Sequence, residues 1–121
     1  MLFTGVDLIE VERIERAIER HGDRFLTRIF TPAEIDLFSG NAPSLAARWA
    51  AKEAVAKALG TGIGDVEWVE VEILRGPDKE PILNLYGNAK RIAEEKNLTD
   101  WSLSLSHTHE HAIALVVAQS V

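Results

Sequence analysis

Hydrophobic and polar residues alternate along two stretches of the chain, which is the pattern of β-strands with one solvent-exposed face. Val69, Val71 and Ile73 alternate with glutamates, and Leu103 and Leu105 alternate with serines. Three further apolar stretches have the length of strands, and turn residues separate the members of two expected antiparallel pairs. The predicted strands are residues 2–8, 68–74, 81–86, 101–107 and 112–118.

Between the strands, apolar residues recur with the period of an α-helix. Val11, Ile14 and Ile18 share one face of a helix predicted over residues 10–21, which Gly22 ends. Thr31-Pro32-Ala33-Glu34 is typical of a capping box and predicts a short helix to Phe38. Two more helices are predicted, over residues 45–59 with Ser44 as the N-cap, and from the N-cap Asn88 to Lys96. Antiparallel strands with segregated helices indicate the α+β class, here an antiparallel sheet packed on a long central helix.

The predicted helix at residues 45–59 carries an acid and three bases on a run of alanines. Trp49, Glu53 and Lys57 lie one turn apart on one face, and Arg48 and Lys52 form a neighbouring row. Small alanines fill much of the rest, so other backbone can approach closely. By itself, the Glu53–Lys57 spacing indicates either an exposed i,i+4 ion pair or part of a functional site.

Length and composition limit the class of protein. A chain of 121 residues predicts one domain, residues 1–121. It contains no cysteine, so disulfides, thiolate ligands and a thiol nucleophile are excluded. We find no signal peptide pattern at the start and no apolar run near the roughly 20 residues of a membrane span, and we expect a cytoplasmic protein with no membrane partner.

The net charge of −6 argues against a general nucleic-acid binder, but the basic residues crowd the first half. Residues 1–60 carry eight Lys/Arg and nine Asp/Glu, whereas residues 61–121 carry five and ten. Arg13, Arg16 and Arg20 repeat at helical spacing in that first half. They form either a solvated surface laced with glutamates or a docking face for an acidic partner.

Two other motifs carry candidate chemistry. Gly60-Thr61-Gly62-Ile63-Gly64 could approach phosphate, although it follows a helix and lacks the Lys-Ser/Thr ending of a P-loop. His107, His109 and His111 alternate and could bind Zn²⁺ or Ni²⁺ if they shared one strand face. The expected turn around Thr108 and Glu110 breaks that period, and His107 alone could equally be a turn residue.

Four motifs in order form a recognisable set: Gly5-Val6-Asp7, Arg48 to Lys57, Gly60 to Gly64, and Leu105-Ser106-His107-Thr108. Together they resemble the holo-[acyl-carrier-protein] synthase family, the small phosphopantetheinyl transferases, and the resemblance runs from Thr4 to Ala118. It implies the 4′-phosphopantetheinyl transferase-like fold. It also implies Mg²⁺-dependent transfer of 4′-phosphopantetheine from coenzyme A to a serine of acyl carrier protein, which releases adenosine 3′,5′-bisphosphate and supports fatty acid biosynthesis.

The resemblance also implies the roles of individual residues. Asp7 and Glu53 match the metal-binding carboxylates, and Lys57 matches a lysine near the phosphates. Trp49 departs from the family, which more often has phenylalanine there. The matched coenzyme-binding residues are Arg48, Gly62, Gly87, Ser106, His107 and Thr108, with Arg48 and His107 on the 3′-phosphate.

The expected partners are coenzyme A, an acyl carrier protein and further copies of the chain. Arg13, Arg16 and Arg20 would dock the acidic carrier, and the family suggests a homotrimer with each site between neighbouring subunits. The alternative function is a non-catalytic carrier-binding module that uses the same arginines and turns over no coenzyme.

Overall fold

The computed structural model describes residues 1–120 and is built around one long helix, α4 (Ala42–Leu59). Before α4 come the strand β1 (Leu2–Glu10) and three helices, and after it come a short 3₁₀ turn, four strands and one helix. The helices are α1 (Val11–His21), α2 (Asp23–Ile29), α3 (Pro32–Phe38) and α5 (Gly87–Glu95). The 3₁₀ turn is η1 (Trp68–Glu70), and the later strands are β2 (Val71–Arg75), β3 (Pro81–Leu85), β4 (Leu98–His107) and β5 (His111–Ser120).

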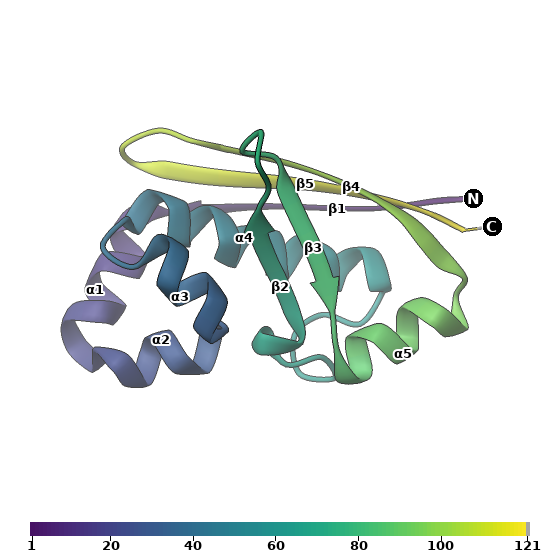
Figure 1. Ribbon diagram of the computed structural model, residues 1–121, viewed down its shortest axis with the longest axis horizontal. Helices are drawn as coiled ribbons and strands as arrows, with labels where there is room; N and C mark the ends of the chain where they lie inside the picture. The colour runs from purple at the N-terminus through teal and green to yellow at the C-terminus, as the bar shows by residue number, and fades with distance from the viewer. Residues whose placement is uncertain (121) are drawn as a thin grey trace.

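Two antiparallel sheets lie on α4. The larger sheet has the order β1-β5-β4 and the smaller is the β2-β3 hairpin. Figure 1 shows α4 beneath the long sheet, with the hairpin crossing it, α1 to α3 at one end and α5 at the other. The prediction of an α+β fold with an antiparallel sheet on a long central helix is therefore confirmed. No helix within residues 1–120 is long and apolar enough to cross a membrane.

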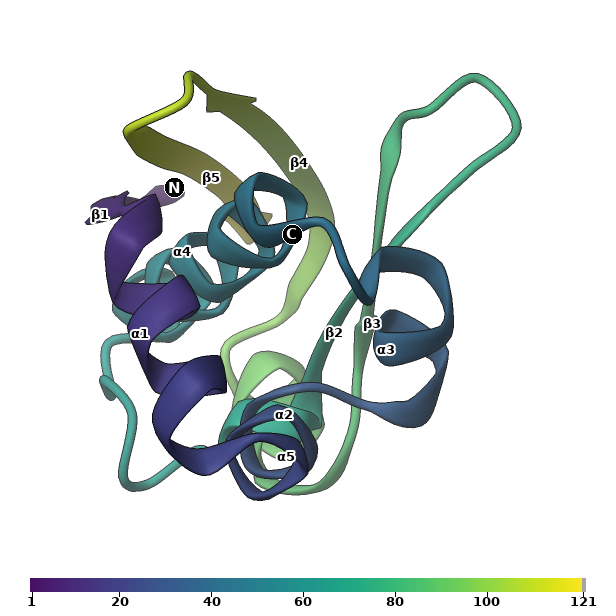
Figure 2. The same cartoon turned by 90° about the vertical axis from the view of Figure 1, so that its left-hand side faces the viewer.

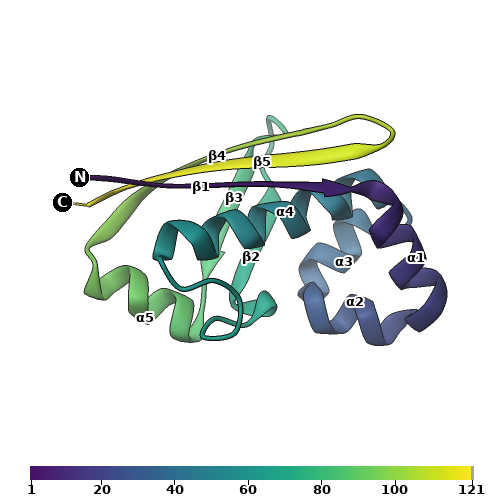
Figure 3. The ribbon, with the colours of Figure 1, turned by 180° about the vertical axis from the view of Figure 1, so that it is seen from behind.

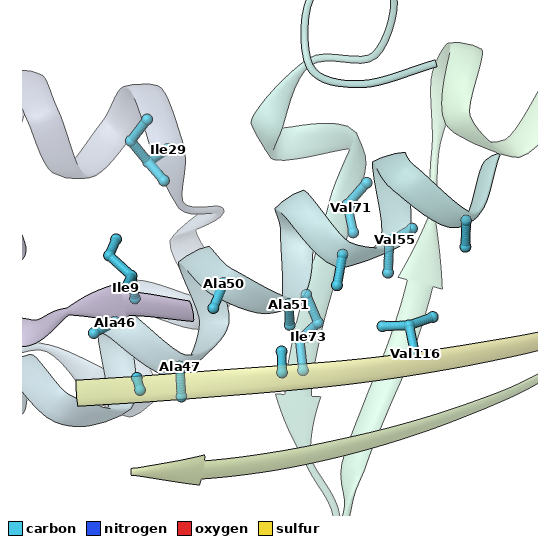
Figure 4. Packing of buried hydrophobic residues seen from close by; sticks show 14 of the residues in the cluster. Ile9, Ile29, Ala46, Ala47, Ala50, Ala51, Val55, Val71, Ile73 and Val116 are labelled. Carbon is cyan, nitrogen blue, oxygen red and sulfur yellow. The ribbon is translucent and has the colours of Figure 1, made fainter. Parts of the chain in front are cut away.

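The core is built from the small residues of α4 and the inward faces of the strands. Ala46, Ala50 and Ala54 are completely buried, and Val116 of β5 packs into the same core (Figure 4). At Gly5, β1 lies so close to α4 that an added Cβ would be 1.9 Å from the Ala54 carbonyl oxygen. Because Gly5 has no side chain and Ala54 has only a methyl group, β1 can lie directly against α4.

We expect Gly5→Ala to destabilise the protein by about 3 kcal/mol or more, because the new methyl group meets rigid helix backbone. Urea denaturation measures the loss. Gly76→Ala is the matched control, since its Cβ would meet only the flexible end of the Glu80 side chain, which can move away. Equal, small losses in the two variants would contradict a backbone contact between β1 and α4.

Two helix starts differ from the sequence prediction. The N-cap of α4 is Asn41, whose side chain accepts a hydrogen bond from the Ser44 backbone N–H, so the predicted cap Ser44 is wrong. Asn88 is also wrong as a cap, because α5 begins at Gly87 and the Glu70 carboxylate from η1 accepts the Asn88 N–H at 2.8 Å. The capping box at Thr31 and Glu34 is confirmed in both of its hydrogen bonds.

Other elements also differ from the sequence prediction, because packing in the folded chain decides where they begin and end. β1 continues to Glu10, so Asp7 lies inside the strand opposite Ala114 rather than at its end. Residues 68–70 form η1 instead of the start of a strand. α2 was not predicted, since its seven residues lack a side-chain cap and a long apolar period.

Candidate active site

Asp7, Glu53 and Lys57 come together because β1 lies along α4. The Lys57 ammonium donates to the Asp7 carboxylate at 3.2 Å and to the Val6 carbonyl oxygen at 2.9 Å. Glu53 lies one helical turn before Lys57 and is close enough for the charge of Asp7 to affect it. The structure therefore brings the three residues into one cluster, which the spacing along the chain could not show.

The two carboxylates of this cluster repel each other. Burial raises the pKa of Glu53, and the negative charge of Asp7 raises it further, against smaller opposing effects of Lys57 and Arg13. The Asp7 and Glu53 carboxylates supply the oxygen ligands that a hard divalent cation prefers, and binding such a cation would relieve their repulsion. Within residues 1–120, no group of three or more Asp, Glu, His or Cys side chains could hold a metal ion. Any Mg²⁺ at this pair would thus complete its shell with water and substrate oxygens.

Aromatic rings cover the α1 end of this face. Trp49 packs edge-to-face against Phe25 and Trp68, and the Arg13 guanidinium lies 5.4 Å from the Trp49 ring centroid. Arg13, Arg16 and Arg20, the predicted arginine stripe, all lie on α1, but Arg13 and Arg16 make different contacts. Arg16 forms an exposed ion pair with Glu12 at 2.7 Å, whereas Arg13 reaches toward Trp49, one turn before Glu53.

The residues matched to the coenzyme lie at opposite ends of α4. Gly62 follows the C-terminal end of α4 and Gly87 begins α5, whereas Ser106 and His107 end β4 and Thr108 is in the turn before β5. Figure 3 shows the loop after α4 beside α5, whereas the β4–β5 turn lies at the other end of the molecule, above α1. Arg48 lies in the first half of α4 and is 7% exposed. Among residues 1–120, no hydrogen bond or ion pair joins Ser106, His107 or Thr108 to the Asp7–Glu53–Lys57 cluster.

The histidine trio does not form a metal site in the described part of the chain. His107 ends β4 and His111 begins β5, with a hydrogen-bonded turn between them at Thr108. The three side chains consequently do not share one strand face, and the absence of a ligand cluster there agrees with that geometry.

The sequence did not reveal a buried ion pair beside the site. Lys52 and Glu34 are both fully buried, and the ammonium donates to the Glu34 carboxylate at 2.7 Å and to the carbonyl oxygens of Trp68 and Val71. The other Glu34 oxygen accepts the Ile73 N–H. This network joins α3, α4 and β2. The capping box was a sequence signal for the position of Glu34, but nothing in the sequence indicated its partner.

We expect Lys52→Met to lower the free energy of unfolding by about 3 to 5 kcal/mol, because it leaves the Glu34 charge buried without a partner. Burial lowers the pKa of Lys52, and the charge of Glu34 and its hydrogen bond to Lys52 oppose that shift. Urea denaturation of Lys52→Met and of the exposed control Lys90→Met measures the difference. A loss below about 1 kcal/mol would contradict the structural role of the pair.

Comparison with known proteins then decides the family. A profile of the 4′-phosphopantetheinyl transferase superfamily matches residues 4–116. This chain belongs to that superfamily. Holo-[acyl-carrier-protein] synthases of Dehalococcoides mccartyi and Herpetosiphon aurantiacus are 53% and 48% identical to it. The matches cover 98% and 97% of this chain and 99% and 98% of the relatives.

A solved structure agrees with the assignment to the phosphopantetheinyl transferases. The Helicobacter pylori holo-[acyl-carrier-protein] synthase in complex with coenzyme A superimposes with a TM-score of 0.87 at 34% identity, over 96% of this chain and 99% of that one. The resemblance drawn from four short motifs is thereby confirmed, and so is the 4′-phosphopantetheinyl transferase-like fold.

Proposed function

We propose that this phosphopantetheinyl transferase acts as a holo-[acyl-carrier-protein] synthase, which moves 4′-phosphopantetheine from coenzyme A to a serine of an acyl carrier protein. The observation that carries the proposal is the Asp7–Glu53–Lys57 cluster in a chain that is 53% identical to a holo-[acyl-carrier-protein] synthase. We further propose a single transferase domain over residues 1–121, a cytoplasmic location and a role in fatty acid biosynthesis.

In the proposed reaction the carrier serine oxygen attacks the β-phosphorus of coenzyme A. The new bond joins that oxygen to phosphorus, the bond from phosphorus to the departing oxygen breaks, adenosine 3′,5′-bisphosphate leaves and the serine proton passes to solvent. Lys57 holds a positive charge 3.2 Å from Asp7, where it can stabilise the phosphoryl oxygens as charge shifts onto them. Asp7 and Glu53 would hold Mg²⁺, which when bound neutralises charge on the transferring group.

We propose that the coenzyme lies between subunits of a homotrimer. Gly62 and Gly87 would contact it from one subunit, and Arg48, Ser106, His107 and Thr108 from the neighbour. An α-helix rises about 1.5 Å per residue, so the 18 residues of α4 span about 27 Å between the end that Gly62 follows and the end near the β4–β5 turn, and Arg48 lies in the half away from Gly62. The distance along α4 supports a ligand that bridges two copies.

An exposed apolar face supports the same assembly. Leu2, Val6, Leu8, Ile113 and Leu115 on the outer face of β1 and β5 are 41–63% exposed. Val6 pairs with Leu115 and Leu8 with Ile113, so these four side chains form one continuous patch. Monomeric soluble proteins rarely expose such a patch, which favours its burial between copies.

The acidic carrier would dock on α1 through Arg13 and Arg16, with Arg20 in support. Arg13 is closest to the candidate site, because its guanidinium stacks on Trp49, which lies one turn before Glu53. A carrier bound there would have its serine near the carboxylate pair.

We expect Arg13→Glu to raise the KM for carrier protein about tenfold or more and to leave the KM for coenzyme A within about twofold, because a docking charge is reversed. Steady-state kinetics at two salt concentrations measure both constants, and wild-type association should weaken as salt increases. Arg91→Glu, on the exposed face of α5, is the control. Equal effects on both substrates would contradict this docking face.

The function itself is tested by following release of adenosine 3′,5′-bisphosphate from coenzyme A by chromatography. Release should require both an apo carrier protein and Mg²⁺. Binding of the carrier with no release would instead favour a non-catalytic carrier-binding module.

A further inference from the structure

Two arginines flank one aromatic ring where α3, α4 and β2 meet. The guanidinium carbon of Arg48 lies 3.9 Å from the Phe38 ring centroid, and that of Arg75 lies 5.5 Å from the same centroid. Phe38 is 1% exposed, so the ring is fixed by the core. Figure 2 shows α3 beside β2 and the N-terminal half of α4, which explains how residues far apart in the sequence meet.

The described residues offer this pair of arginines no carboxylate at ion-pair distance. Within residues 1–120, neither Arg48 nor Arg75 takes part in an ion pair, and Arg48 Nε is buried without a hydrogen-bond partner. Burial lowers the pKa of Arg48 to about 10, and the charge of Arg75 contributes to the lowering, against a smaller opposing effect of Glu34. Two guanidinium groups that repel each other beside a rigid ring form a site where a bound anion would relieve the repulsion.

Two acidic groups, on α3 and in the turn after β2, already accept hydrogen bonds. Both oxygens of the Glu34 carboxylate accept hydrogen bonds, one from Lys52 and one from the Ile73 N–H. In the turn that follows Arg75, the Glu80 carboxylate accepts the Asp78 N–H. Arg75 itself is exposed, so an anion from solvent can reach its guanidinium beside the buried Arg48.

We infer that Arg75 is a second phosphate-binding residue, which acts with Arg48 to bind the ribose phosphate monoester of the coenzyme. This inference rests on the proposed function, in which Arg48 contacts the 3′-phosphate. A phosphate monoester carries close to two negative charges at neutral pH, which two guanidinium groups can match. A coenzyme without this group leaves the repulsion between the arginines uncompensated. Arg75 is therefore a specificity-determining residue for the phosphorylated coenzyme.

Binding of coenzyme A and of dephospho-coenzyme A to the full-length protein, measured by calorimetry without carrier protein, tests this role. Wild type should bind coenzyme A at least about tenfold more tightly than dephospho-coenzyme A. Arg75→Ala should weaken coenzyme A binding about five- to tenfold and leave dephospho-coenzyme A binding within about twofold. Arg91→Ala, an exposed arginine of α5, should change neither affinity.

The melting temperature of the free protein separates binding from a structural role. Because Arg75→Ala removes a repulsion with Arg48, the unliganded variant should melt no lower than wild type. Inorganic phosphate, as a second probe, should stabilise wild type far less than coenzyme A does; equal stabilisation would overturn the assignment to the coenzyme.

The outcomes distinguish this inference from the proposed function. If wild type prefers coenzyme A and Arg75→Ala keeps the full preference, the role of Arg75 is overturned while the proposed function stands. If wild type binds both ligands equally, the phosphate contact of Arg48 fails as well, and the role of Arg75 fails with it. Equal weakening of both ligands, together with a lower melting temperature, would make Arg75 a structural residue and overturn the inference.

Discussion

Glu53→Gln and Asp7→Asn are each expected to slow phosphopantetheine transfer by about a hundredfold to a thousandfold at limiting Mg²⁺. Each change keeps the size of the side chain but removes one anionic oxygen ligand, and a bound cation contributes several kcal/mol of charge stabilisation in the transition state. Initial rates over a Mg²⁺ titration measure the effect, and the variants should need more Mg²⁺ for half-maximal rate.

The fold should survive these two changes. Removing either charge relieves the repulsion between the two carboxylates, and the Asp7–Lys57 ion pair that Asp7→Asn also loses is partly exposed to solvent, so the melting temperature should change little. Glu15→Gln, on the surface of α1, is the matched control and should leave the rate unchanged. A variant of Asp7 or Glu53 that kept near wild-type turnover at limiting Mg²⁺ would contradict the metal assignment.

The second large effect is expected from Leu115→Arg, which should break the proposed trimer and abolish transfer. Leu115 is 46% exposed at the centre of the apolar patch, so the subunit can fold with a charge there, but the buried interface cannot accept it. We expect a monomer by sedimentation and a loss of activity of more than about a hundredfold, since each site would lack one of its two halves. Ile82→Arg, on β3 outside the patch, is the control at 39% exposure.

Complementation between subunits sharpens this test. At coenzyme A concentrations below KM, Glu53→Gln should be nearly inactive and His107→Ala clearly slowed, but mixed trimers should exceed the summed activities of the two, because some sites combine an intact Glu53 with an intact His107 from the neighbouring subunit. A Leu115→Arg monomer that stayed active, or a mixture that regained nothing, would contradict a site between subunits.

Local signals in the sequence predicted most of the elements. The Thr31–Glu34 capping box needs only four consecutive residues, and the structure confirms both of its hydrogen bonds. The start of α4 was placed too late, because Asn41 and Ser44 are both good capping residues and only the geometry chooses Asn41. The seven-residue helix α2 gave no clear periodicity and was missed.

The site was harder to predict, because its residues meet through long-range packing. Asp7 and Lys57 are 50 positions apart, and they meet because Gly5 lets β1 lie directly on α4. Only the family resemblance indicated that encounter. Lys52 was placed on a row with Arg48, but its burial depends on Glu34, 18 positions away, and no local pattern reports that partner. The pairing of Arg48 with Arg75 around Phe38 depends likewise on how β2 packs against α3 and α4.

The most direct measurement is the intact mass of an apo acyl carrier protein after incubation with this protein, coenzyme A and Mg²⁺. We predict a gain equal to one 4′-phosphopantetheine group. The gain should disappear when the acceptor serine of the carrier is replaced by alanine, and it should be greatly slowed when Glu53→Gln replaces the wild-type enzyme. A carrier that binds this protein but keeps its original mass would contradict the proposed transfer.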